Sequence, residues 1–345
     1  MKNDFAARSR SVLGTLALAL LGASVGVACA AASDANLGKQ SDAGSGGTGG
    51  AVTTTATTTT SAASSSSGEG GSLGVGGSDG LTKGDIYVHS LDTLYHFEPI
   101  ASELTVIGAF DCILGHTSVS SDSGMQDIAV DKSGTMYGVA KVDGQSPGSN
   151  QDHIIVSVDK ASGHCQTELV VPKTLIDPKG SVEVRGLSFI PQETTVDGGS
   201  ETLVGLEITG HYLRIDLANK AVGLLGNLNG NGPAAWHTKG ADIVSIIDDR
   251  TYVTAMRENE ATDSLAVMAP KTGAIIQGYP KTGLTTIGGL AYWGGTLYAF
   301  TVAGKAYSID PKTGVETEIV VHNAPVGVQY HGAGVTTAAP IVIPN

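Results

Sequence analysis

A short strand followed by a polar turn recurs five times between residues 82 and 345, and this repeat constrains the fold more than any other feature. In each copy apolar and polar residues alternate, which is the pattern of a strand with one buried face. The turns are rich in Asp, Pro and Gly. These residues favour hairpins because Asp bonds its own following backbone, Pro presets φ and Gly accepts positive φ. The five copies are residues 95–99, 155–163, 212–220, 265–273 and 307–314.

A second unit, made of a small-residue strand, a tight turn and another strand, precedes the hairpins. It is clearest at residues 127–138, and its counterparts begin at Gly186, Gly240 and Gly289. Together the two units give four strands per repeat, at a spacing of 41 to 61 residues. Four-stranded antiparallel sheets set around an axis form a β-propeller. The sequence therefore predicts an all-β chain whose folded body is a β-propeller.

Over residues 82–345 this repeat resembles that of the NHL-like and YVTN-like β-propellers of bacterial envelopes, which include exported lipoproteins. The resemblance rests on the order of strands and turns. It implies four-stranded blades, a ligand site at the axis, and a place in the cell envelope. The glycines that begin the inner strands have a steric explanation, because inner strands converge where side chains are crowded. These glycines are Gly186, Gly240, Gly289 and Gly332.

The two ends of the body predict a ring that its own C-terminus closes. Residues 84–88 resemble a second strand with no first strand before it, and residues 332–338 resemble a first strand with nothing after it. The C-terminal strand can therefore supply the inner strand of the first blade, which removes two open sheet edges. This predicts five blades. Six or seven stay open, because three long loops have room for irregular strands, at residues 111–124, 141–151 and 172–184.

Residues 1–29 have the layout of a secretory signal peptide. Lys2, Arg8 and Arg10 form a positively charged start, and a short apolar run follows at residues 12–21. A transmembrane helix is the weaker interpretation, because this run is well short of the ~20 residues that cross a bilayer. We therefore expect the protein to be exported.

Two ways of processing this leader at Cys29 stay open. Residues 26–29 resemble a bacterial lipobox, whose Cys carries a lipid, and residues 28–30 satisfy an ordinary small-x-small cleavage site. We favour lipidation of Cys29, because it leaves Cys112 and Cys165 as an even pair in an exported chain. These two cysteines end the first two repeats, where neighbouring outer strands can bring them together. They predict a disulfide.

Residues 30–81 form a tether between the leader and the propeller. Of the 40 residues from 41 to 80, 34 are Gly, Ser, Thr or Ala. Such a segment buries too little apolar surface to offset its ordering entropy. At this length a flexible coil has an r.m.s. reach of roughly 40 Å. We expect a lipid-anchored protein that faces the periplasm or the exterior of a bacterial membrane, with a freely secreted protein as the alternative.

The charge balance argues against one class of partner. The chain carries 20 basic and 33 acidic residues, for a formal net charge of −13. Without the leader, which holds three basic residues and one acidic one, the charge becomes −15. Nucleic-acid affinity comes mainly from Lys and Arg at phosphates, so no nucleic-acid partner is expected. No CxxC or HxxxH spacing and no nucleotide-binding motif occurs, so neither a metal nor a cofactor is predicted.

Candidate ligand-binding residues lie at the starts of the inner strands and in the loops before them, where they would line the funnel of the propeller. This mixture of acids, bases and imidazoles suits a polar ligand, although the same residues are also ordinary for a solvated funnel. They are Gln126, Asp127, Arg185, Trp236, His237, Lys239, Asp242 and His331.

Three functions follow from this organisation. The first is a membrane-tethered binding module whose partner is a protein or a glycan, and it is favoured because the sequence shows a tether and a scaffold. No serine stands on a strand-to-helix nucleophile elbow and no pair of carboxylates stands out as acid and base, so no catalytic set is evident. The alternatives are an exported propeller hydrolase, lactonase-like or glycan-processing, with its active site in the funnel, and a structural component of the envelope.

Overall fold

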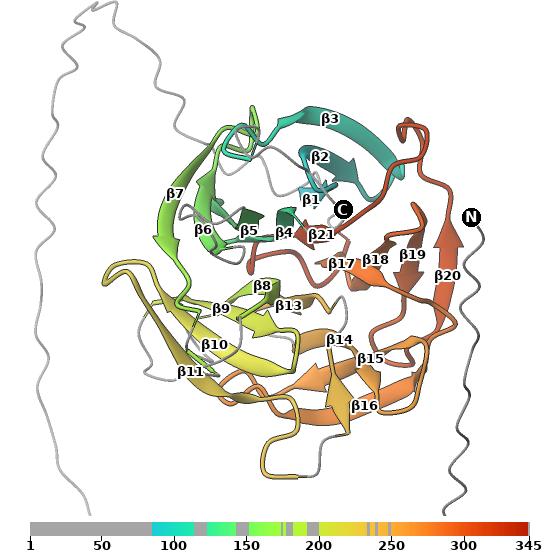
Figure 1. Cartoon of the computed structure of the whole chain (residues 1–345). Helices are drawn as coiled ribbons and strands as arrows, with labels where there is room; N and C mark the ends of the chain where they lie inside the picture. Colours follow the sequence, from blue (N-terminus) through green and yellow to red (C-terminus); the bar gives the residue numbers. More distant parts are fainter. Residues whose placement is uncertain are drawn as a thin grey trace, which may run out of the picture. The chain divides into compact units, whose positions relative to one another are not determined.

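The folded body is a ring of five small antiparallel sheets around a central axis (Figure 1). All regular structure in the described part of the chain is β-strand. This is a five-bladed β-propeller, so the predicted fold class and blade count are confirmed. The computed structural model describes residues 85–343 except 114–122, 143–151, 174, 177–181, 192–199, 233–234, 239–240 and 248–249.

The predicted leader, residues 1–29, and the predicted tether, residues 30–81, lie outside the described residues. Cys29 and Lys239 do so as well. Within the described ranges, no helix has the length and apolarity needed to cross a bilayer.

The blades are numbered along the chain, and their strands are given from the axis outward. Blade 1 contains β21 (Gly332–Gly334), β1 (Ile86–His89), β2 (Thr93–Glu98) and β3 (Glu103–Ala109). Blade 2 contains β4 (Gly124–Val130), β5 (Met136–Val142), β6 (Asp152–Val158) and β7 (Cys165–Val170). Blade 3 contains β8 (Val184–Ile190), β9 (Thr202–Glu207), β10 (His211–Asp216) and β11 (Ala221–Asn227).

Blade 4 differs, because two short strands share the position nearest the axis. Both β12 (Trp236–His237) and β13 (Ile243–Ser245) pair with β14 (Thr251–Arg257), and the blade continues with β15 (Asp263–Met268) and β16 (Ile275–Lys281). Blade 5 is regular and contains β17 (Ile287–Trp293), β18 (Thr296–Thr301), β19 (Ala306–Ile309) and β20 (Glu316–Ile319).

The C-terminal strand closes the ring as the sequence predicts. β21 pairs antiparallel with β1, with Gly332 opposite His89 and Gly334 opposite Tyr87. The pairing covers the inner edge of β1, which would otherwise be open. The predicted strand extended to residue 338, and this was wrong: β21 ends at Gly334.

The chain leaves β21 because its next residues bond to other blades. Residues 335–343, here called the closing segment, cross the end of the axis at which the inner strands finish. Their hydrogen bonds reach blades 2 to 5 in turn. Thr336 donates to the Asp131 carbonyl of blade 2 at 2.9 Å, and Thr337 donates to Glu201 of blade 3. In blade 4 the Ile247 N–H donates to the Thr337 carbonyl at 2.9 Å, and in blade 5 the Gly294 N–H donates to the Pro340 carbonyl at 2.8 Å. The ring is therefore fastened across this end by its own C-terminus.

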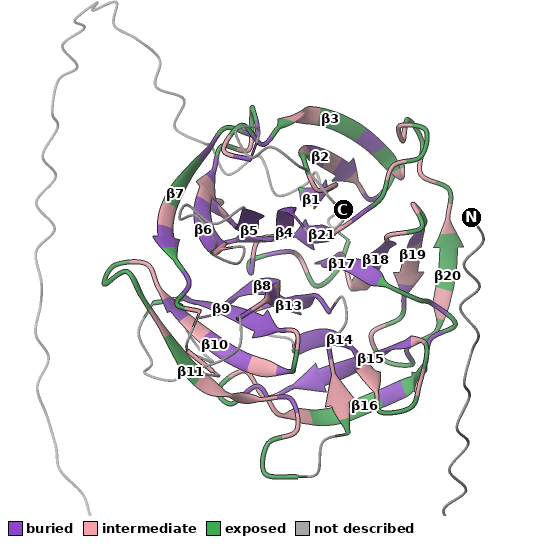
Figure 2. Ribbon diagram, viewed as in Figure 1, coloured by how far each residue is buried: buried purple, intermediate pink, exposed green. Residues whose placement is uncertain are grey.

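The apolar core lies between neighbouring blades. Every residue of β4 and of β17 is buried, whereas the outer strand β3 exposes several residues (Figure 2). Inner strands are covered by the blades on both sides, which explains why nearly all of their residues are buried. Across the junction of blades 1 and 5, the rings of Phe97 and Phe300 meet edge to face with centroids 5.2 Å apart.

Two of the hairpin turns also fasten a blade to the one before it. The Tyr212 hydroxyl of blade 3 donates to the Pro270 carbonyl in the turn of blade 4, at 2.8 Å. The Tyr279 hydroxyl of blade 4 donates in the same way to the Pro311 carbonyl of blade 5, at 2.5 Å. The turn glycine Gly273 lies directly against the Tyr212 ring, where a Cβ would come within 2.5 Å. The repeated turn sequence thus serves contacts between blades as well as hairpins.

The inner strands crowd the axis, as the steric explanation of their glycines predicts. A Cβ on Gly289 would lie 2.8 Å from the Gly332 carbonyl carbon, and one on Gly186 would lie 2.9 Å from the Ala241 oxygen. A Cβ on Gly332 would lie 2.1 Å from His89 Nε2. Real Cβ atoms do not make such approaches, so the prediction is confirmed at these three glycines. Gly240 lies outside the described residues.

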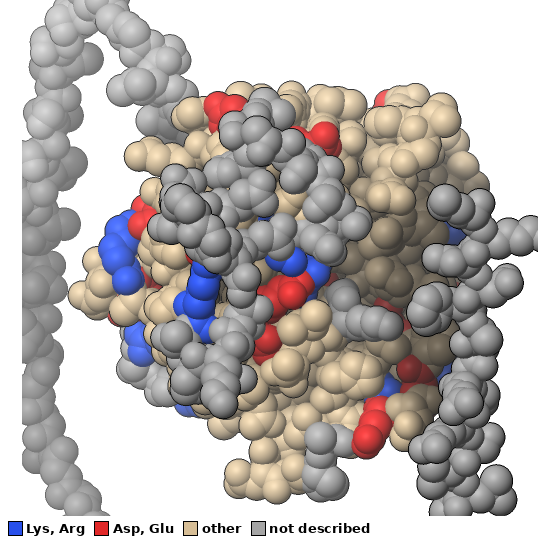
Figure 3. Space-filling model, in the orientation of Figure 1, with Lys and Arg blue, Asp and Glu red and all other residues tan. Residues whose placement is uncertain are grey.

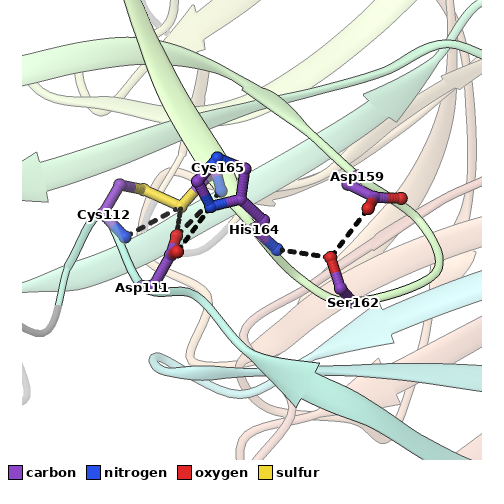
Figure 4. Close-up of polar contacts among 6 residues, drawn as sticks. All are labelled: Asp111, Cys112, Asp159, Ser162, His164 and Cys165. Carbon is purple, nitrogen blue, oxygen red and sulfur yellow. Dashed lines mark hydrogen bonds and ion pairs between the residues drawn. A yellow bond between two sulfur atoms is a disulfide. The ribbon is translucent and has the colours of Figure 1, made fainter.

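The predicted disulfide between Cys112 and Cys165 is present and joins blade 1 to blade 2 (Figure 4). The two Cα atoms are 5.3 Å apart. Asp111, beside Cys112, accepts a hydrogen bond from the Cys165 N–H at 2.9 Å and pairs with the His164 ring at 2.5 Å. The disulfide therefore stands within a polar junction between the outer strands.

Removing this disulfide, by the Cys112→Ala and Cys165→Ala double substitution, is expected to lower the free energy of unfolding by about 2–4 kcal/mol. The bond closes a loop with a sequence separation of 53 residues, so its loss frees the unfolded chain more than the folded one. Guanidinium unfolding of the variant and of the wild type, each with and without reductant, measures the effect. Equal midpoints for reduced and oxidised wild type would show that the disulfide adds no stability.

Candidate functional site

Two of the predicted residues occupy equivalent β-bulges in neighbouring blades. The register between β4 and β5 skips Gln126, and that between β8 and β9 skips Arg185. A bulge leaves its extra residue unpaired and redirects the side chain. Here the two side chains meet, because Arg185 Nη1 donates to Gln126 Oε1 at 2.6 Å. Both lie at the end of the axis where the inner strands begin.

Around this pair lies a polar group that we call the mouth cluster, made of Gln126, Lys141, His153, Glu183, Arg185 and His331. Arg185 also donates to Glu183, and Lys141 Nζ lies 3.5 Å from the same carboxylate. Figure 3 shows basic and acidic side chains adjoining one another near the middle of the face in view. The cluster therefore joins side chains of blades 2 and 3 with His331, the residue before β21.

Burial and charge set the protonation states within the mouth cluster. Burial lowers the pKa of His153 to about 4. Burial is also the main cause that lowers the pKa of His331, and the positive charge of the neighbouring Arg185 lowers it further. Burial alone would raise the pKa of Glu183, but Arg185 and Lys141 together hold it below its ordinary value. At neutral pH the cluster thus holds two cations, one carboxylate and two neutral imidazoles.

Several buried polar atoms of the mouth cluster have no hydrogen-bond partner among the described residues. They are Arg185 Nε, His153 Nδ1 and His331 Nε2. Buried polar atoms are nearly always paired in folded proteins, so each needs an explanation. Of these three residues, His331 also lines a hollow of about 340 Å³, together with Tyr95, the Ser90–Asp92 turn and residues 325–329.

Deeper on the axis lies an acid pair, Asp127 and Asp242, neither of which has any exposed surface. Their carboxyl groups accept backbone N–H groups from the region of the inner strand in every blade. Asp127 accepts from Ile128 of blade 2 at 2.8 Å and from Leu187 of blade 3 at 2.5 Å. Asp242 accepts from Ile243 of blade 4 at 2.5 Å, and also from Leu290 of blade 5 and Ala333 of blade 1. The acid pair therefore ties all five blades together at the axis.

Burial raises the pKa of both carboxyl groups, and for Asp127 the negative charge of Asp242 raises it further. Two carboxyl groups that interact directly in a buried site retain one proton between them at neutral pH.

His89, which is also fully buried, lies close to Asp127 of the acid pair. The Cβ position of Gly332 is 2.1 Å from His89 Nε2 and 2.5 Å from Asp127 Oδ1. Burial lowers the pKa of His89 to about 3, so its ring is neutral.

The retained proton predicts a loss of stability in alkaline solution. A carboxyl group whose pKa is raised by folding stabilises the fold in its protonated form, so stability falls as pH rises toward the folded-state pKa. The buried histidines have lowered pKa values and do not titrate above about pH 7 in either state. Because the pKa of Asp242 is raised to about 7, we expect the free energy of unfolding to fall as pH rises through about 7, by at most ~1.4 kcal/mol per pH unit for one proton. Urea unfolding across this range measures it, and a flat profile would mean that the pair holds no proton.

Two other predicted residues lie apart from the mouth cluster. Trp236 and His237 form β12 and pair with Arg257 and Met256 of β14. The Trp236 ring lies 4.8 Å from the Arg257 guanidinium and packs within blade 4. Burial raises the pKa of Asp263, and the nearby His237 acts on it in the opposite direction. In the described part of the chain, no group of three or more His, Cys, Asp or Glu side chains is arranged to hold a metal ion.

The structure thus brings Gln126, Arg185 and His331 together in the mouth cluster and places Asp127 and Asp242 beneath them as a buried pair. The sequence reasoning missed four residues of this region: His89, Lys141, His153 and Glu183. One signal was present. Lys141 interrupts an otherwise apolar strand, and a charge in such a strand usually has a polar partner.

No protein-family model and no curated protein matches the chain. Solved structures resemble it in fold only. A protein of unknown function from Bacteroides thetaiotaomicron has 13% identity and a TM-score of 0.41, covering 72% of this chain and 63% of its own. An oligogalacturonate lyase in complex with manganese has 10% identity and a TM-score of 0.33, covering 69% and 62%. BamB from Moraxella catarrhalis has 11% identity and a TM-score of 0.31, covering 68% and 57%. The chain thus spans less than two thirds of each of these structures.

Proposed function

We propose that this chain is a β-propeller tethered to the cell envelope that acts as a binding module, with the mouth cluster as its ligand site. One observation carries the proposal: buried polar atoms that have no partner in the described part of the chain gather at one end of the axis, at Arg185, His153 and His331. The closing segment crosses the other end. Ligand sites typically combine a hollow with a few convergent polar groups.

The tether part of the proposal rests on the sequence of residues 1–81. A lipid on Cys29 would anchor the chain, and the Gly/Ser/Thr/Ala-rich segment would let the propeller reorient above a bacterial membrane. Mass spectrometry of the mature N-terminus tests this. A diacylated Cys29 is expected. An unmodified N-terminus beyond Cys29 would contradict the lipid anchor and would favour a secreted protein.

Retention of envelope glycans and envelope proteins on the immobilised full chain tests the binding function. The matched pair of variants is Arg185→Gln, in the mouth cluster, and Arg250→Gln, whose guanidinium bonds Gln277 on an exposed surface. We expect the wild type and Arg250→Gln to retain the same ligand, and Arg185→Gln to retain about tenfold less, since it loses a charge-assisted contact. Retention that is absent, or equal in all three proteins, would refute a ligand site at the mouth.

A propeller hydrolase is the second candidate, favoured only by the close pair of carboxyl groups at Asp127 and Asp242. Both are fully buried, and their oxygens already accept hydrogen bonds from backbone N–H groups. The pair therefore stabilises the fold and is not placed to contact a substrate. Metal analysis of the purified chain, together with lactone and glycan hydrolysis assays, tests this candidate. A structural envelope component, the third possibility, would retain no ligand in the assay above.

A further inference from the structure

The mouth cluster carries a surplus of positive charge in an acidic protein. Lys141 and Arg185 share the single carboxylate of Glu183. Asp152, which also faces His153, is already paired with Lys173 at 2.6 Å. The arginine and Glu183 side chains are only 20% exposed, so water screens this charge incompletely.

Among the described residues, the acid pair beneath the cluster forms no ion pair with Lys141 or Arg185. Its carboxyl groups have no exposed surface, and five backbone N–H groups hold the single negative charge that they share. The positive charge at the mouth is therefore left for a group that arrives from outside.

Arg185 is fixed in place before any ligand arrives. Its Nη1 is held by Gln126, and Gln126 Nε2 in turn donates to the Gly124 carbonyl at 3.0 Å. Its Nη2 is held by Glu183. Of its three guanidinium nitrogens, only Nε has no partner among the described residues, and it is buried. A side chain held in this way loses little entropy when it binds, so its free donor acts as a preformed contact.

Resting on the proposed function, we propose that the mouth cluster binds the carboxylate of a small acidic ligand, such as a sugar acid. One carboxylate oxygen accepts the Arg185 Nε–H, and the carboxylate charge offsets the surplus of Lys141 and Arg185. The neutral ring of His331 offers a further hydrogen-bonding atom. The body of the ligand occupies the hollow of about 340 Å³ that His331 lines, a volume within the range of small-molecule sites.

Calorimetric titration of the full chain with glucuronate and with glucose tests this, because the two differ in the carboxylate alone. We expect glucuronate to bind at least about tenfold more tightly than glucose, because glucose has no carboxylate to pair with the positive charge of the mouth cluster. Arg185→Gln should weaken glucuronate binding by about 10–100-fold and leave glucose unaffected, while Arg250→Gln should change neither. Increasing salt should weaken glucuronate binding to the wild type, a readout that does not depend on the folding of any variant.

Equal binding of glucose and glucuronate, or unchanged binding in Arg185→Gln, would overturn the carboxylate proposal. Inorganic phosphate that binds as tightly as glucuronate would overturn it too, by showing a general anion site. These failures are separate from failure of the proposed function. A chain that retains an envelope ligand through Arg185 but ignores glucuronate is still a binding module, whereas a chain that fails both assays is not.

Discussion

Replacing Asp242 with alanine is expected to lower the free energy of unfolding by about 3–5 kcal/mol. Its carboxyl group accepts the N–H groups of Ile243, Leu290 and Ala333, which belong to three different blades. The variant leaves all three donors buried without an acceptor, and it removes the partner with which Asp127 shares a proton. Guanidinium unfolding followed by circular dichroism measures the effect.

The matched control for this prediction is Asp310→Ala. Asp310 also accepts a backbone N–H, from Lys312 at 2.8 Å, but it does so in an exposed hairpin turn. Water can replace that acceptor, so the expected loss is about 0.5–1.5 kcal/mol. Asp242→Asn should fall between the two, because asparagine keeps only one acceptor oxygen. If Asp242→Ala were no more destabilising than Asp310→Ala, the acid pair would not be what ties the blades at the axis.

Gly332→Ala is expected to lower the free energy of unfolding by about 1–3 kcal/mol, although it adds only a methyl group. The new Cβ would lie 2.1 Å from His89 Nε2 and 2.5 Å from Asp127 Oδ1, both fully buried. Gly223→Ala is the matched control, since Gly223 also lies in a strand but has no atom within 4 Å of its Cβ position. That variant should stay within about 0.5 kcal/mol of wild type. Equal thermal and chemical stability of the two variants would contradict the crowded axis.

The ring and its closure were predictable from sequence because they depend on local chemistry repeated along the chain. The hairpin turns reuse Asp, Pro and Gly, all three of which occur in the turn at residues 310–314. The strand at residues 84–88 lacks an inner neighbour, and the strand predicted at residues 332–338 lacks an outer one, so each indicates the other. The disulfide was predictable for the same reason, since Cys112 and Cys165 end successive repeats. Predicting these features requires only the repeat and the spacing between its copies.

Part of the axis was predictable and was overlooked. Superposing the repeats puts Asp127 and Asp242 at the same inner-strand position, each followed by Ile, where blades 3 and 5 have Gly followed by Leu. Equivalent positions of inner strands meet at the axis of a propeller, so the repeat already implied that the two carboxyl groups approach each other. Their burial and shared proton follow from that approach.

Other features depend on contacts that no local pattern encodes. The closing segment bonds to four blades through backbone and side-chain groups far apart in the sequence, such as Thr336 with Asp131. Trp236 lies in β12 because the inner strand of blade 4 is interrupted, and its ring packs against Arg257 instead of facing a ligand. Lys141 and His153 lie on β5 and β6, and not on an inner strand, where a funnel residue is expected from sequence.

The most direct test of a ligand site at the mouth is histidine-selective NMR of the full chain during addition of an envelope glycan digest. His153 and His331 belong to the mouth cluster, whereas His96 and His164 pair with Asp85 and Asp111 elsewhere on the propeller. The account predicts saturable shifts of the His153 and His331 ring signals, with His96 and His164 unmoved. Unmoved signals for both mouth histidines, or shifts confined to His96 and His164, would contradict it.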